Sequence, residues 1–91
     1  MEAAARVALV GIVVEDPDSV TALNAILHDY GPYIFGRMGV PYPKYGVSVI
    51  SVAVDAPQAV ISALSGKLGM LPGVTTKTIY SKVGEPHENA D

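Results

Sequence analysis

The chain has 91 residues, of which 49% are hydrophobic and 16% are charged, and it contains no cysteine. This composition excludes a disordered chain, disulfide bonds and any chemistry that depends on a cysteine thiolate. The formal net charge is −3, but residues 6–82 carry six basic and five acidic side chains, which leaves +1. Such a near-neutral body lacks the basic surface of an independent nucleic-acid binder. We expect one domain with one core.

The first half of the chain predicts a strand, a helix and a second strand. Residues 6–14 form an almost wholly apolar run of strand length. Asp16 as N-cap, with Pro17 at the first helical position, predicts a helix start, and apolar residues at helical spacing continue to Tyr30. Residues 33–42 then predict a strand that two glycines interrupt and two prolines close.

The second half repeats this order, with a strand at 46–54, a helix at 56–71 and a β-branched strand at 74–83. An internal repeat supports the reading, because a shift of forty residues superimposes similar residues of the two halves. The matched pairs include Val7 with Val47, Leu9 with Val49, Val14 with Val54, Glu15 with Asp55, Pro17 with Pro57, Val20 with Val60, and Ile34 with Val74. Two interleaved βαβ halves predict a ferredoxin-like α+β fold, βαββαβ, with a four-stranded antiparallel sheet and both helices on one face.

Both faces of the two central strands are apolar in this arrangement. Alternation directs one set of side chains to the helices: Ala8, Val10, Ile12, Val14, Ser48, Ile50, Val52 and Val54. The opposite set has nothing in the chain to cover it and is the predicted oligomer interface: Val7, Leu9, Val13, Val47, Val49 and Ala53. We therefore expect a homodimer or homotetramer that buries this face, the alternative being that loops and the tail shield it.

The ends are expected to differ from the body: residues 1–5 as a flexible N-terminus, 6–83 as the domain and 84–91 as an acidic disordered tail. The apolar run at 7–14 is too short to span a membrane, and no cleavage site follows it. We expect no export and no membrane contact. The lack of cysteine fits a cytoplasmic protein.

Sequence motifs give little support for catalysis or metal binding. SGKLG, residues 65–69, lacks the first glycine and the hydroxyl of a phosphate-binding loop and is better explained as a helix end. His28 and His87 have no histidine partner at helical spacing, and helix capping already accounts for the acids of EDPD, residues 15–18. No nucleophile motif is present, and the central strands lack aromatic residues for base stacking. We expect no enzyme, no cofactor, no metal site and no direct nucleic-acid binding.

The segment YGPYIFGRMGVPYPKYG, residues 30–46, holds four of the five tyrosines and no acid. Arg37 lies between two glycines, with Tyr42 and Tyr45 nearby in sequence, and an arginine with aromatic neighbours suits a carboxylate, a phosphate or a neighbouring chain. These three residues, with His28 and Tyr30, are the candidate ligand- or partner-binding residues. The alternative is structural, with bulges and prolines that protect an edge strand.

Four stretches carry a family resemblance: GIVVED, LHDYGPYIFGRMGVPY, GVSVISVAVDAP and ALSGKLGMLPGVTTKTIYSK. Together, from Ala8 to Lys82, they resemble the small ACT-like proteins named as regulators of the iron-only hydrogenase system. The resemblance implies an ACT-like fold, an oligomer and a regulatory role. Amino-acid-binding ACT domains usually have a glycine in the turn after the first strand, where this chain has the acidic EDPD. The histidine and cysteine ligands of nickel-responsive repressors are also absent.

The leading hypothesis is a cytoplasmic, non-enzymatic regulatory module that assembles through its sheets. Its expected partners are a small-molecule effector or a protein near Arg37, and a DNA-binding protein for any effect on transcription. The alternative is a purely structural protein–protein interaction subunit that binds no ligand.

Overall fold

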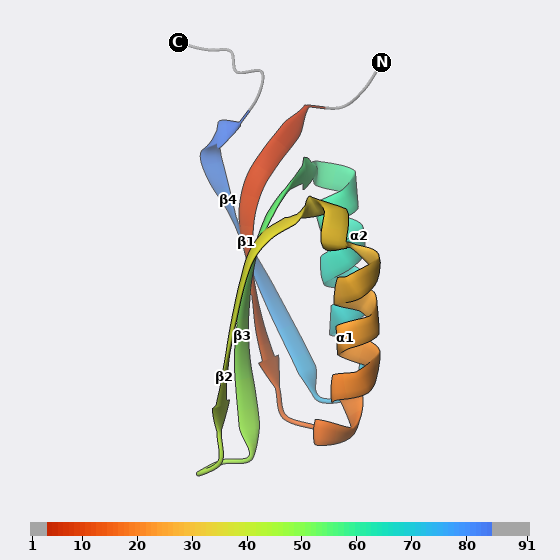
Figure 1. The fold of residues 1–91 in the computed structure, drawn as a ribbon, viewed down its shortest axis with the longest axis vertical. Coiled ribbons are helices and arrows are strands. Elements are labelled where there is room, and N and C mark those ends of the chain that lie inside the picture. The colour runs from red at the N-terminus through yellow and green to blue at the C-terminus, as the bar shows by residue number, and fades with distance from the viewer. Residues whose placement is uncertain (1–3, 85–91) are drawn as a thin grey trace.

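The computed structural model describes residues 4–84, and it contains four strands and two α-helices (Figure 1). The elements are β1 (Ala5–Val14), α1 (Val20–Asp29), β2 (Ile34–Tyr42), β3 (Val47–Pro57), α2 (Gln58–Gly69) and β4 (Val74–Gly84). Every strand and helix predicted from the sequence is present. Of the predicted terminal segments, Ala5 belongs to β1 and Gly84 belongs to β4. Residues 1–3 and 85–91 lie outside the described residues. None of the helices in residues 4–84 is long and apolar enough to cross a membrane.

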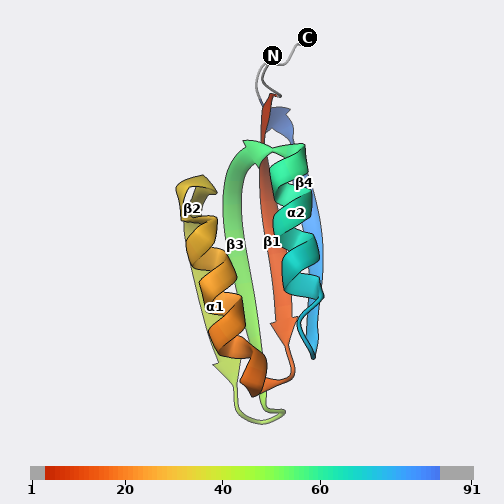
Figure 2. The same ribbon diagram turned by 90° about the vertical axis from the view of Figure 1, so that its right-hand side faces the viewer.

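The four strands form one antiparallel sheet in the order β2-β3-β1-β4, so β1 and β3 are central. Both helices lie on the same face of this sheet (Figure 1). Figure 2 shows α1 on the β2 side and α2 on the β4 side. The predicted ferredoxin-like βαββαβ fold is confirmed.

The internal repeat corresponds to an approximate two-fold relation within the sheet. Gly11 of β1 lies opposite Ser51 of β3, and these two residues are forty apart in sequence. Two flanking pairs are related by the same shift, Ile34 with Val54 and Val74 with Val14. The axis of this relation therefore passes between Gly11 and Ser51, at the centre of the sheet.

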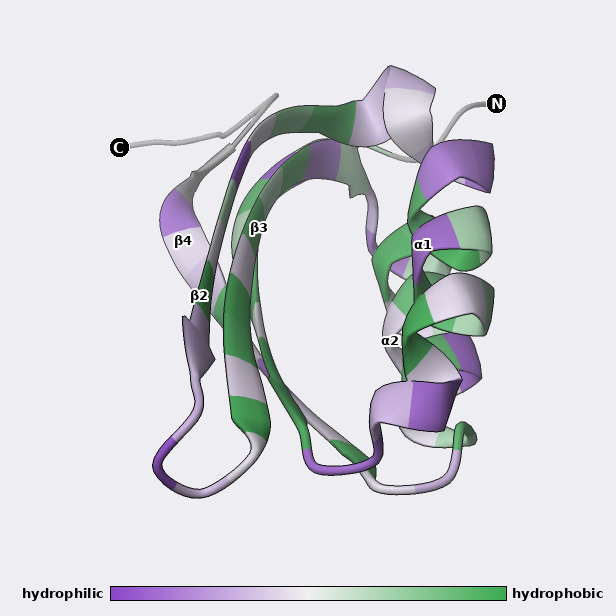
Figure 3. Ribbon diagram, turned by 60° about the horizontal axis from the view of Figure 1, so that its bottom comes forward, coloured by the Kyte–Doolittle hydropathy of each residue, from purple (hydrophilic) through white to green (hydrophobic). Residues whose placement is uncertain are grey.

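The core lies between the sheet and the two helices. Figure 3 shows hydrophobic segments of both layers where they face each other. Its largest fully buried side chains are Ile12, Leu23, Ile61, Leu64, Leu68, Val10, Val52 and Val54. The central strands β1 and β3 contribute every second residue to this layer, as the alternation predicted. All of the side chains predicted to face the helices are buried except Ser48, which is half-buried.

The start of the first helix differs from the sequence prediction by one turn. Asp16 does act as an N-cap, because its side chain accepts a hydrogen bond from the backbone N–H of Asp18 at 2.9 Å. The turn that it caps is a 3-10 helix, Pro17–Ser19, and α1 begins only at Val20. The N-terminal turn of a helix is often of this tighter type.

Two loops meet at the end of the molecule where α1 begins. The Ser19 hydroxyl donates to the carbonyl of Pro72 at 2.6 Å, and the Glu15 N–H donates to the carbonyl of Gly73 at 2.7 Å. Gly73 has φ +68°, and a Cβ there would lie 2.9 Å from the backbone nitrogen of Asp16. Only glycine allows this approach, so the Pro-Gly pair between the end of α2 at Gly69 and the start of β4 joins the two halves.

Candidate functional site

Arg37 lies on the edge strand β2, on the face of the sheet that carries the helices. Arg37 is paired with the buried residue Val52 of β3. Because paired residues on neighbouring strands point to the same face, Arg37 lies on the helix-bearing face. Because β2 is the outermost strand, the side chain stays exposed beside α1 instead of entering the core. Its NH2 group donates a hydrogen bond of 2.7 Å to the Oδ1 atom of Asn24 on α1.

A cleft of about 320 Å³ lies between α1 and β2, and its wall contains Asn24, Leu27, His28, Gly31, Ile34 and Arg37. Asn24 and His28 are four residues apart on α1, so they share one side of the helix. Leu27 is buried and Ile34 is half-buried, which gives the cleft an apolar part next to its polar groups. The cleft thus combines one cation, one carboxamide and one imidazole with an aliphatic surface.

The charge of Arg37 is not neutralised by another side chain of residues 4–84. Its hydrogen bond goes to a neutral carboxamide, and no acidic side chain in this part of the chain pairs with it. The carboxamide fixes the direction of the guanidinium group without reducing its charge. An anion that enters the cleft therefore meets an oriented cation.

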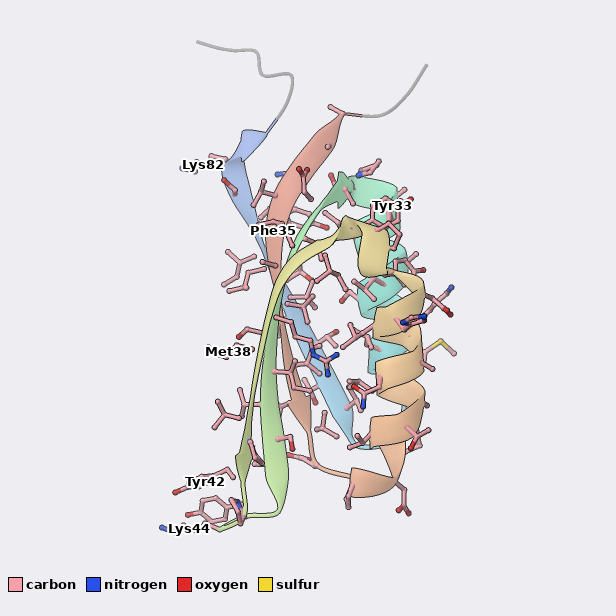
Figure 4. All side chains as sticks on the ribbon, in the orientation of Figure 1. Tyr33, Phe35, Met38, Tyr42, Lys44 and Lys82 are labelled. Atoms are coloured by element: carbon pink, nitrogen blue, oxygen red, sulfur yellow. The ribbon has the colours of Figure 1, made fainter. Side chains whose placement is uncertain are left out.

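The structure brings together two of the five candidate residues, Arg37 and His28, and separates the three tyrosines from them. Tyr42 lies on the opposite face of β2 from Arg37, and Tyr45 follows in the hairpin, with the two ring centroids 5.7 Å apart. Figure 4 shows Tyr42 at the far end of β2, close to the hairpin. Tyr30 packs partly against the core, with Lys67 Nζ 5.1 Å from its ring centroid.

Sequence reasoning missed Asn24 as a member of this group. A signal was available, because Asn24 precedes His28 by one helical turn on the predicted helix. Its partner in the hydrogen bond, Arg37, lies thirteen residues away on another element. Only the packing of α1 beside β2 brings the two together.

The second feature is the sheet face without helices, here called the open face. The six predicted interface residues lie on it, in alternation with the buried residues of β1 and β3. Leu9 is 42% exposed and Val49 is 47% exposed. Val10 and Val52, on the same two strands but facing the helices, are fully buried. No helix or loop of residues 4–84 covers this face.

The edge strands enlarge the apolar area of the open face. Met38 and Val40 of β2 lie opposite Ser51 and Val49 of β3, and Ile79 of β4 lies opposite Leu9. Figure 4 shows Met38 and Tyr42 on the side of the sheet away from the helices. The sequence prediction counted only the central strands and therefore underestimated this face.

In the part of the chain that the structure describes, no three histidine, aspartate or glutamate side chains lie together where they could hold a metal ion. His28 belongs to the cleft as a single imidazole. The polar groups of the cleft carry N–H donors, which can bind and orient an anion through hydrogen bonds.

Comparison with known proteins places this architecture in a family. The structure of uncharacterized protein TM1266 from Thermotoga maritima is similar, with a TM-score of 0.82 and 32% sequence identity. The match covers 86% of this chain and 99% of that chain. No curated protein matches the sequence. The TM1266-like family, described as "Iron-only hydrogenase system regulator, putative", matches residues 6–78. Because this match covers most of the chain, the protein belongs to the TM1266-like family.

Proposed function

We propose that this protein is a non-enzymatic regulatory module of the iron-only hydrogenase system, and that it acts by binding, as a homo-oligomer assembled through its open face. The family description supplies the biological system. The apolar open face, with Leu9 and Val49 nearly half exposed, carries the proposal of assembly. A regulator of this kind changes the state or the availability of a partner and needs no catalytic group.

The dimensions of the open face support a second copy of the chain as its cover. The molecule measures 46 × 23 × 18 Å, and the sheet spans the longest and the shortest of these directions (Figures 1 and 2). The sheet face thus has a projected area of roughly 800 Å², which is about what one partner contributes to a standard protein–protein interface.

The relief of the open face also favours a copy of itself. On the two central strands, the middle of this face holds the small residues Gly11 and Ser51. Larger residues flank them, with Leu9 on one side and Val13 with Val49 on the other. A two-fold axis in the plane of the interface, between the central row and the row of Val13 and Val49, would place the larger row of each copy against the small residues of the other. Packed sheets bury their facing side chains in this interdigitated way.

Charges on the open face fit the same arrangement. Lys77 of β4 lies in the row of Gly11, and Asp55 of β3 lies in the row of Val7. These two side chains have opposite signs, and a two-fold axis repeats both across the interface. We propose a homodimer or a homotetramer on this basis, in the cytoplasm, where a protein without cysteine has no need of an oxidising compartment.

The proposed output of the module depends on partners. The cleft beside α1 is the proposed site of a small-molecule effector or of a protein contact. The near-neutral body argues against direct DNA binding, so any effect on transcription requires a DNA-binding protein partner. Retardation of a promoter fragment by the purified protein alone at physiological salt would contradict this part of the proposal.

The experiment that tests assembly is native mass spectrometry, followed by denaturing mass spectrometry of the same sample. We expect a dimer or tetramer for the natural chain. Val49→Asp places a charge next to the centre of the open face and should give monomers with an unchanged circular dichroism spectrum. Ser62→Asp, an equal charge change at an exposed position of α2, should leave the oligomer intact. If the natural chain stays monomeric at every protein concentration tested, the proposed assembly is refuted.

The same preparations separate the regulator from a purely structural subunit. Mass that the oligomer carries under native conditions and loses on denaturation indicates a bound effector. Arg37→Ala should preserve assembly and abolish binding of that effector, because Arg37 lies on the face opposite to the proposed interface. Collapse of Arg37→Ala to monomers would favour the structural role instead.

A further inference from the structure

We propose that the cleft between α1 and β2 binds a small organic monocarboxylate, with Arg37 as the group that receives the carboxylate. This inference rests on the proposed function, because it names the chemical class of the effector. The evidence is the oriented guanidinium of Arg37 in a cleft of about 320 Å³ whose other walls are a carboxamide, an imidazole and two aliphatic side chains.

The hydrogen bond between Arg37 and Asn24 is the first step of the argument. A guanidinium group has five N–H donors, and Asn24 Oδ1 engages the NH2 group at 2.7 Å. The remaining edge can accept a planar carboxylate in the two-point geometry that arginine favours. Since a carboxamide and not a carboxylate holds the arginine, the positive charge stays available for the ligand.

The cleft supports a single negative charge and disfavours a polyanion. Arg37 is the one lysine or arginine in its wall, and α1 ends beside it, with His28 in the last turn of the helix and Gly31 just beyond. The C-terminal end of a helix carries partial negative charge. A di- or triphosphate would meet this charge with only one cation to offset its own, so nucleotides are poor candidates.

The apolar part of the cleft selects a ligand with a short hydrocarbon portion. Leu27 and Ile34 both contact the core and also form part of the cleft wall. A chain of a few carbon atoms attached to the carboxylate can cover this aliphatic surface. His28 contributes a ring that can donate to or accept from a second polar group on the ligand.

The test is a titration followed by two-dimensional nitrogen–proton NMR of the full chain. Sodium butanoate is the probe, butanamide is the neutral analogue and sodium phosphate is the anion of a different class. We expect saturable shifts of the Asn24 side-chain amide and of the Arg37 Nε–H with butanoate, at a Kd in the millimolar range for so small a ligand. Butanamide and phosphate should give no saturable shift at these groups.

Asn24→Asp is the sharpest variant, because it keeps the shape of the side chain and adds a carboxylate beside Arg37. That carboxylate should occupy the guanidinium and weaken butanoate binding about tenfold or more, with the fold intact. Arg37→Gln should have an effect of similar size. Arg6→Gln is the matched control, since Arg6 NH1 is likewise bound to a carboxamide, Gln58 Oε1 at 2.9 Å, but Arg6 is not in the wall of the cleft.

Each result decides the proposal. It stands if butanoate binding is lost in Asn24→Asp and Arg37→Gln and kept in Arg6→Gln. It falls if butanoate gives no saturable shift, if the Asn24→Asp variant binds as well as the natural chain, or if phosphate binds as tightly as butanoate. Native mass spectrometry of the same samples keeps the two proposals apart: an oligomer without butanoate binding refutes only this inference, and a monomer that binds butanoate refutes only the proposed assembly.

Discussion

The two faces of the sheet are built from the same residue types and have opposite environments. Along β1, Val10 is fully buried under the helices, while the neighbouring residue Leu9 is 42% exposed on the open face. Hydropathy alone therefore does not say which face the chain covers. Charged residues of the strands also occur on both faces: Lys77 and Asp55 lie on the open face, and Arg37 lies at the edge of the face that carries the helices. The position of the helices decides which face is buried.

This difference separates what stabilises the single chain from what would hold copies together in the proposed oligomer. The face under the helices contributes to folding of every molecule, whether alone or assembled. The open face contributes fully only when another surface covers it, so its contribution depends on protein concentration. Substitutions on the two faces should therefore change different measured quantities.

Leu64→Ala should have the largest effect on the folded chain. Leu64 of α2 is 1% exposed, and loss of its side chain leaves a cavity in the core, at a cost of about 2 to 5 kcal/mol in the free energy of unfolding. Leu9→Ala, the same chemical change on the open face, should cost about 1 kcal/mol or less in dilute solution. Urea unfolding followed by circular dichroism at several protein concentrations measures both. Equal losses at the lowest concentration would remove the distinction between the faces.

Two glycine turns, at Gly73 and Gly46, differ in the same way: one is packed against another loop and the other is not. Gly73 and Gly46 have nearly the same backbone angle, φ +68° and +67°, but a Cβ at Gly73 would meet Asp16 and one at Gly46 would meet nothing within 4 Å. Gly46→Ala should cost about 1 kcal/mol from the backbone angle alone and lower Tm by about 4 to 8 °C. Gly73→Ala adds the collision and should lower Tm at least twice as far. Similar Tm values for the two variants would contradict the close approach of the two loops.

Much of the fold could be predicted because its elements are long, strongly periodic and sharply bounded. Several sequence features marked the boundaries of these elements clearly. They are the apolar run after Arg6, the prolines at positions 17 and 57, and the Pro-Gly before Val74. The forty-residue repeat then reduced the topology to two interleaved halves. The 3-10 turn at Pro17–Ser19 was missed because capping and proline placement are the same at the start of either helix type.

The candidate site was harder to predict, because it depends on contacts between elements. Arg37, Tyr42 and Tyr45 were grouped by closeness in sequence, but residues an odd number apart on a strand point to opposite faces, which separates Arg37 from Tyr42. That alternation was readable in advance. The pairing of Arg37 with Asn24 was not, because it arises from the packing of α1 beside β2.

A valine-to-threonine exchange at Val49 of β3 gives the smallest expected effect on the single chain, and the same exchange at Val52 makes the comparison of the two faces direct. Val52→Thr buries a hydroxyl among core side chains and should cost about 1 to 3 kcal/mol. Val49→Thr, three residues away and 47% exposed, should change the free energy of unfolding of the dilute chain by no more than about 0.5 kcal/mol. Chemical unfolding at low protein concentration measures the free energy of unfolding of both variants. Sedimentation at rising protein concentration measures their assembly.

The value of this pair lies in the second measurement. If a copy of the chain covers the open face, the hydroxyl of Val49→Thr is buried on assembly and must lose its water, so the dissociation constant rises by about fivefold or more while the chain itself stays as stable. An unchanged dissociation constant would mean that Val49 remains wet in the oligomer. The interface would then lie on another surface, and the apolar open face would need a different partner.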